Sequence, residues 1–144
     1  MRRGFLIAGV VALAAIVAVF VYMRLAMTPP AELDVSRSRA TAGGLYNVAI
    51  SPESEPIQQN ALHGWTVTVT TRDGQPVSDA QISVDGGMPQ HGHGLPTSPQ
   101  ITDNLGDGRY RLEGVRFNMS GWWVLRFSVT APAGTDTVEF NLTL

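Results

Sequence analysis

The hydrophobic and polar pattern begins with one long apolar segment. Residues 4 to 23 form an uncharged run of twenty residues, with Arg2 and Arg3 before it and Arg24 directly after it. As a helix rising about 1.5 Å per residue, this run would be about 30 Å long, the thickness of the hydrocarbon core of a bilayer. The pattern therefore predicts a transmembrane helix within residues 1–24.

A cleaved signal peptide is the alternative reading of this segment. Signal peptides carry an apolar core of about 7 to 15 residues followed by small residues at the cleavage site. Here Tyr22, Met23 and Arg24 follow the apolar run, so we expect an uncleaved anchor. Because two arginines precede the run and one follows it, the positive-inside rule places the N-terminus in the cytoplasm. We therefore expect a single-pass protein of the bacterial inner membrane with a periplasmic C-terminal domain.

The remainder of the chain changes pattern twice. Residues 25–44 are polar, begin with prolines and have no hydrophobic periodicity, which is typical of a flexible tether. Residues 45–144 contain short alternating runs such as "HGWTVTVTT" and "TDTVEFNLTL", separated by turn residues. In the first of these, Trp65, Val67 and Val69 share one face. The spacing predicts an all-β fold, an immunoglobulin-like β-sandwich of six to seven strands.

The amino-acid composition argues against several classes of function. The chain has no cysteine, so disulfides, thiolate metal sites and thiol catalysis are excluded. Beyond residue 24, seven arginines stand against twelve acidic residues, a net charge of 7 − 12 = −5. This balance argues against nucleic-acid binding, which needs clustered positive charge. No nucleophile elbow, phosphate-binding loop or dinucleotide fingerprint is present, and we expect the protein not to be an enzyme.

One loop carries most of the candidate chemistry. The stretch "GGMPQHGHGLPT", residues 86–97, has too many glycines and prolines for a regular helix or strand. It presents Met88, His91 and His93, and the two histidines at i and i+2 project to one side of an extended backbone. Thioether and imidazole ligands together suit copper, whereas calcium and magnesium need oxygen ligands. The loop therefore predicts a copper site.

Two further residues are candidates for completing this site. Met119 lies in the turn "FNMSG" between two expected strands, and His63 opens the strand "HGW". If the three segments meet at one edge of the sandwich, five soft or borderline ligands converge there. Each residue also has an ordinary interpretation, because loop histidines are commonly solvated and methionines commonly fill gaps in a core.

Several of these motifs also carry a family resemblance. The order "LHGW", "MPQHGHG", "GDGRY" and "FNMSGWW" from Leu62 to Leu144 resembles the YtkA-like domain, which is related to the FixH group of membrane-anchored proteins. The resemblance implies an N-terminal anchor and an exported immunoglobulin-like sandwich. It places Met88, His91, His93 and Met119 at signature positions, and His63 beside them. The FixH branch implies a role in assembling copper-containing respiratory oxidases.

Two functions from different classes follow from these observations. The first is a membrane-anchored domain that binds copper through Met88, His91, His93, Met119 and His63 and passes it to a copper-accepting membrane protein. The second is a structural or protein-interaction module without metal, in which the glycine-rich loop is a rigid recognition turn. Convergence of the five side chains on one point would favour the first function.

Overall fold

The protein consists of two units in a computed structural model that describes residues 2–26, 30 and 32–144 and the side chains of residues 9–25, 30 and 32–144. The units are Met1–Ala31 and Glu32–Leu144. The first contains helix α1, Arg2–Ala26. Among the described residues, no helix has both the length and the apolar character that crossing a membrane requires. Arg2 and Arg3, on which the predicted orientation rests, lie outside the described side chains.

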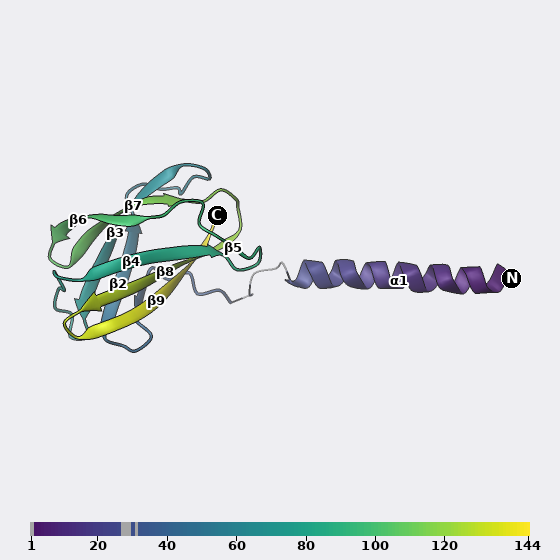
Figure 1. The fold of residues 1–144 in the computed structure, drawn as a ribbon, viewed down its shortest axis with the longest axis horizontal. Coiled ribbons are helices and arrows are strands. Elements are labelled where there is room, and N and C mark those ends of the chain that lie inside the picture. The colour runs from purple at the N-terminus through teal and green to yellow at the C-terminus, as the bar shows by residue number, and fades with distance from the viewer. Residues whose placement is uncertain (1, 27–29, 31) are drawn as a thin grey trace. The chain divides into compact units, whose positions relative to one another are not determined.

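The second unit is made of two antiparallel sheets, shown in Figure 1. One sheet has the order β1-β2-β3-β7-β6 and the other has the order β5-β4-β8-β9. The strands are β1 Ser38–Ala40, β2 Tyr46–Pro52, β3 Leu62–Thr71, β4 Gln81–Met88, β5 His93–Gly94, β6 Gln100–Gly106, β7 Arg109–Arg116, β8 Trp122–Ala131 and β9 Gly134–Thr143. The predicted all-β architecture of two packed sheets is confirmed.

Two of these nine strands differ from the sequence-based expectation of six to seven. Strand β1 falls within residues 25–44, which were expected to be a tether, and β5 falls within the glycine-rich loop. Both have only two or three residues and pair along the edge of a longer strand, so neither is long enough to show an alternating pattern. Each is defined by its hydrogen bonds to the neighbouring strand, β2 or β4, rather than by an alternating pattern of its own.

The compact unit also begins earlier than residue 45, the predicted boundary. It starts at Glu32, and Thr41 within it is buried. The backbone N–H of Ala42 donates to the carbonyl of Thr137 in β9 at 2.8 Å. This attachment could not be predicted from the sequence, because backbone hydrogen bonds require no particular side chain. The part of the expected tether at residues 27–29 and 31 lies outside the described residues.

The core lies between the sheets and follows the predicted alternation. Trp65, Val67 and Val69 of β3 are fully buried, and the threonines between them are half-buried. Strands β8 and β9 contribute the facing layer, whose buried side chains are Trp123, Leu125, Phe127, Val129, Val138, Phe140 and Leu142. Burying each such side chain stabilises the fold by about 1.5–3 kcal/mol. In a chain without cysteine, this packing is the main source of stability.

A buried carboxylate fixes the N-terminal segment of the sandwich to β9. Asp136 is 8% exposed, and its oxygens accept hydrogen bonds from the backbone N–H groups of Gly43, Leu45 and Thr137 at 2.8 to 3.1 Å. A hydrogen bond from the Thr41 side chain, together with that from the Gly43 N–H, holds the pKa of Asp136 far below its ordinary value of 3.8. Folding therefore favours the charged carboxylate.

We predict that Asp136→Asn destabilises the domain and weakens its acid sensitivity. Because the folded-state pKa is lowered, the contribution of Asp136 to stability is present above pH 3.8 and is lost as the pH falls below it. Denaturant unfolding at about pH 7 and about pH 3 should show a lower midpoint for the variant at the higher pH and a smaller difference at the lower pH. Asp79→Asn, at an exposed position, is the matched control. Equal loss of stability at both pH values would contradict this account.

Candidate metal site

The glycine-rich loop is a tight hairpin between β4 and β5. The Met88 carbonyl accepts hydrogen bonds from the N–H groups of both His91 and Gly92, at 3.1 and 3.0 Å. Pro89 follows Met88, at a turn position that suits the fixed φ of proline. Gly92 has a φ of +67°, a left-handed conformation in which a side chain would be strained. The Pro and Gly positions therefore close the hairpin and pair Met88 with His93.

Two glycines let this hairpin lie close to its neighbours. A Cβ atom on Gly86 would lie 2.4 Å from the Val124 carbonyl oxygen of β8, and one on Gly87 would lie 2.4 Å from the His93 carbonyl oxygen. Both separations are below any normal carbon–oxygen contact, so side chains there would push the strands apart. The Gly86-Gly87 pair thus holds the histidine-bearing strand against the end of β4.

The two loop histidines lie together and face solvent. Their rings are stacked, with centroids 5.7 Å apart and planes inclined by 24°. Both side chains are exposed, and within the described residues no hydrogen bond joins either imidazole to another group. An imidazole nitrogen binds a metal at about 2 Å, which puts the ring centroid about 3 Å from the ion. Centroids 5.7 Å apart are therefore within reach of one ion, once the rings turn their nitrogens toward it.

Trp123 joins the loop to the turn that carries Met119. Its indole Nε1–H donates to the Met119 carbonyl oxygen at 3.0 Å. Its ring meets that of His93 edge-on, with centroids 6.4 Å apart, and that of Phe117 at 5.3 Å. Trp123 is fully buried. One buried side chain therefore contacts both the hairpin and the Met119 turn, which are separated in the sequence by strands β6 and β7.

The two methionines occupy different environments at this end of the sandwich. Met88 is 1% exposed and belongs to the core, whereas Met119 is 36% exposed on the turn. The Met88 side chain lies against the turn that carries Met119, because a Cβ on Gly121 would be 3.1 Å from the Met88 Cε atom. Met88 thus contacts this turn from the core, whereas Met119 is exposed on it.

His63 stands apart from the other candidates. It is 6% exposed, and its Nε2 lies 2.8 Å from the Gln58 carbonyl oxygen. Because a carbonyl only accepts, Nε2 carries the proton in this hydrogen bond. The centroid of the His63 ring lies 6.3 Å from that of Phe117, whose ring in turn meets that of Trp123. The structure brings His91, His93, Met88 and Met119 to one end of the sandwich and places His63 behind them.

The sequence pattern did not single out Trp123, Phe117 or Gln90 as residues of this site. The aromatic contacts depend on the register of β8 with β4, which places Gly87 opposite Val124. Gln90 lies inside the hairpin, and its buried Nε2 atom has no hydrogen-bond partner in the described structure. The adjacency of Gln90 to His91 in the sequence was the signal that could have drawn attention to it.

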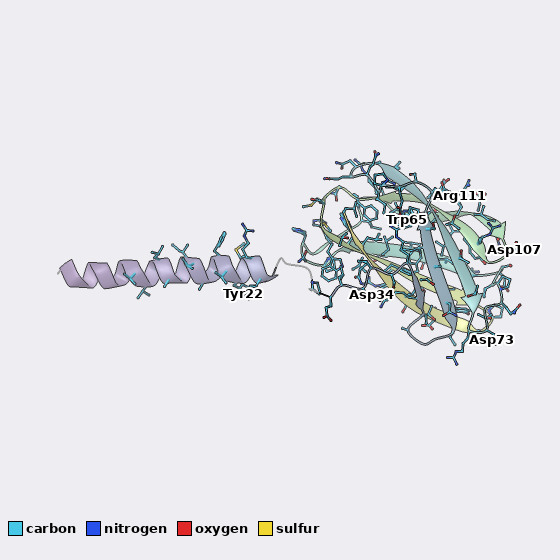
Figure 2. The ribbon with its side chains drawn as sticks, turned by 180° about the vertical axis from the view of Figure 1, so that it is seen from behind. Tyr22, Asp34, Trp65, Asp73, Asp107 and Arg111 are labelled. Carbon is cyan, nitrogen blue, oxygen red and sulfur yellow. The ribbon has the colours of Figure 1, made fainter. Side chains whose placement is uncertain are left out.

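The donor set at this end favours a soft ion. In the part of the chain that the structure describes, no three His, Cys, Asp or Glu side chains gather into a metal-binding group. Met88 and Met119 offer thioether sulfur at the same end of the sandwich. Asp73 and Asp107 lie at one end of the strands in Figure 2, in the turns after β3 and after β6, whereas the loop follows the opposite end of β4. Nitrogen with thioether sulfur is a set that suits copper.

A shallow depression of about 310 Å³ adjoins the loop, and its lining includes Met88, His93 and Arg126. The Arg126 guanidinium donates from Nε to the Glu139 carboxylate at 2.6 Å, and Asp85 lies opposite Arg126 in the β4–β8 pairing. These acidic neighbours offset the positive charge of the arginine. A cation beside His93 would therefore meet little net repulsion from Arg126.

The two sheets and the hairpin define a small all-β sandwich module with a histidine-bearing loop at one end. A model of the YtkA-like family matches residues 41–128. Since the match covers more than half of the chain, the protein belongs to the YtkA-like family. The matched range begins before Leu62, where the resemblance was predicted to start, and it includes all five candidate residues.

Other comparisons add little to this assignment. No curated protein matches the chain. Among solved structures, the chain is similar to the ZirS C-terminal domain, with 14% sequence identity and a TM-score of 0.39 over 74% of this chain and 70% of that one.

We predict that Gly87→Ala disrupts the hairpin, whereas Gly94→Ala is tolerated. The added methyl at residue 87 meets the His93 carbonyl oxygen at 2.4 Å, but a Cβ at residue 94 would lie 3.4 Å from the Gly86 carbonyl oxygen, an ordinary contact distance. Overpacking of this kind costs about 1–3 kcal/mol, and an accommodated change costs within about 0.5 kcal/mol. Urea unfolding measures both. Equal stability of the two variants would show that close approach of the strands does not constrain residue 87.

Proposed function

We propose that this protein is a membrane-anchored, extracytoplasmic copper-binding domain that holds copper at its Met/His loop and delivers it to a membrane protein. The observation that carries the proposal is the stacked, exposed pair His91 and His93, fixed by a tight hairpin whose Met88 side chain lies against the turn that carries Met119. Exposed imidazoles with no hydrogen-bond partner in the described structure are free to bind an ion without first breaking an internal hydrogen bond.

The proposed ligands are unequal in role. His91 and His93 supply nitrogen, and Met119, exposed on the neighbouring turn, supplies sulfur. Met88 would join only by moving its side chain out of the core, at a cost in buried apolar contacts. His63, hydrogen-bonded to Gln58 and buried behind Phe117, serves in this proposal to support the turn from within. A site of two nitrogens and one sulfur suits Cu(I), because thioethers are soft ligands.

The fold supports an immunoglobulin-like assignment for the module. If β2 is taken as the first strand of such a domain, the sheet orders correspond to A-B-E-D for β2-β3-β7-β6 and to C-F-G for β4-β8-β9. These are the orders of immunoglobulin-type sandwiches. Loops at the ends of such sandwiches carry binding residues on a rigid scaffold, as the hairpin after β4 does here. Delivery toward respiratory or other copper enzymes, as in the FixH branch, is the destination that we propose for the metal.

The anchor is the second part of the proposal. Its support is the uncharged run of twenty residues, which lies within the 25-residue helix α1. A periplasmic domain attached to the inner membrane by this helix would be confined to the plane in which membrane-bound acceptors lie. Such confinement raises the effective concentration of donor and acceptor without any new contact between them.

Replacing both histidines, His91→Ala with His93→Ala, should weaken Cu(I) binding at least tenfold, about 1.4 kcal/mol, because two nitrogen ligands are lost. Competition titration of the full-length chain in detergent against a chelator of known affinity measures the change. Asp73→Ala, in the turn after β3, controls for adventitious surface binding. Unchanged affinity in the double variant would remove the loop from the proposal. Absence of copper binding by the unaltered chain would favour a metal-free recognition module instead.

Charged residues in α1 should abolish membrane retention. Leu13→Asp combined with Val17→Asp places two charges in the apolar run, each costing about 2.5–3.5 kcal/mol at the centre of a membrane span. We expect the unaltered chain and a Leu13→Ala, Val17→Ala control to remain in the membrane pellet after carbonate washing, and the charged variant to leave it. Recovery of the unaltered chain in the soluble fraction, shortened at its N-terminus, would identify a cleaved signal peptide.

A further inference from the structure

The two thioethers of the sandwich differ greatly in their access to solvent. The chain has five methionines, and Met88 and Met119 are the two within residues 32–144. Met88 is 1% exposed and Met119 is 36% exposed. Met119 is flanked by Asn118 and Ser120, which are also exposed. A water-soluble reagent therefore has direct access to the side chain of Met119 and not to that of Met88.

The turn around Met119 is held by its backbone rather than by the methionine side chain. The Met119 carbonyl accepts from the Trp123 indole at 3.0 Å, and the Asn118 carbonyl accepts from the Gln59 side-chain amide at 2.7 Å. Gly121 exchanges two backbone hydrogen bonds with Leu144. Because none of these bonds involves the thioether, a chemical change at the Met119 sulfur leaves the turn in place.

We infer that Met119 is a sulfur-oxidation site whose conversion to the sulfoxide lowers the affinity of the loop for Cu(I). This inference rests on the proposed function for its effect on copper, although the difference in reactivity between the two methionines does not. The oxidant is hydrogen peroxide or another peroxide. A lone pair of Sδ forms a bond to one peroxide oxygen, the O–O bond breaks, and the other oxygen leaves after proton transfer, as water from hydrogen peroxide or as an alcohol from an organic peroxide. Sulfur loses two electrons and the peroxide gains them.

The consequence for the site follows from ligand chemistry. The sulfur that the proposed function offers to Cu(I) becomes a sulfoxide, which is polar and no longer a soft thioether. His91 and His93 remain, so binding weakens rather than disappears. The buried Met88 keeps its sulfur and the core keeps its packing. Methionine sulfoxide is reducible enzymatically, which makes the change reversible.

The test compares the two methionines in the full-length chain in detergent. Peptide mass spectrometry follows their oxidation by hydrogen peroxide, with and without Ag(I), a soft ion that stands in for Cu(I) and does not cycle between oxidation states with peroxide. We expect Met119 to oxidise at least tenfold faster than Met88, and bound Ag(I) to slow Met119 specifically. Similar rates for the two residues, or no protection by Ag(I), would overturn the inference.

The effect on copper is measured by Cu(I) competition titration after removal of the peroxide. We expect the oxidised chain to bind at least tenfold more weakly, matching Met119→Leu, a substitution of similar volume without sulfur, and reductase treatment to restore binding in the oxidised chain alone. Unchanged affinity after complete oxidation of Met119 would overturn the inference, while the double-histidine variant would still test the proposed function separately. If the unaltered, reduced chain bound no copper, both would fall.

Discussion

The candidate site depends on one buried side chain, Trp123. Its indole N–H holds the backbone of the Met119 turn, and its ring lies against both His93 and Phe117. The turn between β7 and β8 also meets the hairpin between β4 and β5 where Gly121 lies against the Met88 side chain. Because one fully buried aromatic ring touches both loops, the packing of the core sets the distance between them. The loops can therefore present ligands at a fixed spacing although both face solvent.

The hairpin shows how this rigidity is compatible with exposed imidazoles. Gly86 and Gly87 allow the strands to approach, and the Met88 carbonyl closes the turn with two hydrogen bonds. Neither histidine side chain takes part in these contacts. Stability comes from the buried layers between the sheets, to which Met88 and Trp123 belong, and from the Asp136 carboxylate in β9. The scaffold thus leaves the chemistry-bearing side chains available, which is the usual division between a core and its loops.

Much of this arrangement could be predicted from the sequence, and the reasons for the remainder are physical. Alternation identified the buried face of β3 at Trp65, Val67 and Val69 because strand side chains have a period of two. Whether the segments that carry Met88, His91, His93 and Met119 meet could not be read from the sequence, because it depends on which strands pair; the structure places these four residues at one end of the sandwich. The backbone attachment of Ala42 to β9 could not be seen, because main-chain bonds leave no side-chain signature. The burial of His63 and the contacts of Trp123 depend on cross-strand register, which a single sequence does not encode locally.

The most direct test of the account is X-ray absorption spectroscopy of the full-length chain loaded with one equivalent of Cu(I). If the loop and the turn hold copper together, the spectrum should show imidazole nitrogen scatterers together with a sulfur scatterer, and the sulfur contribution should be lost when Met119 is replaced by leucine. A spectrum with imidazole nitrogen scatterers alone, unchanged by that substitution, would contradict the claim that the loop and the turn hold copper together.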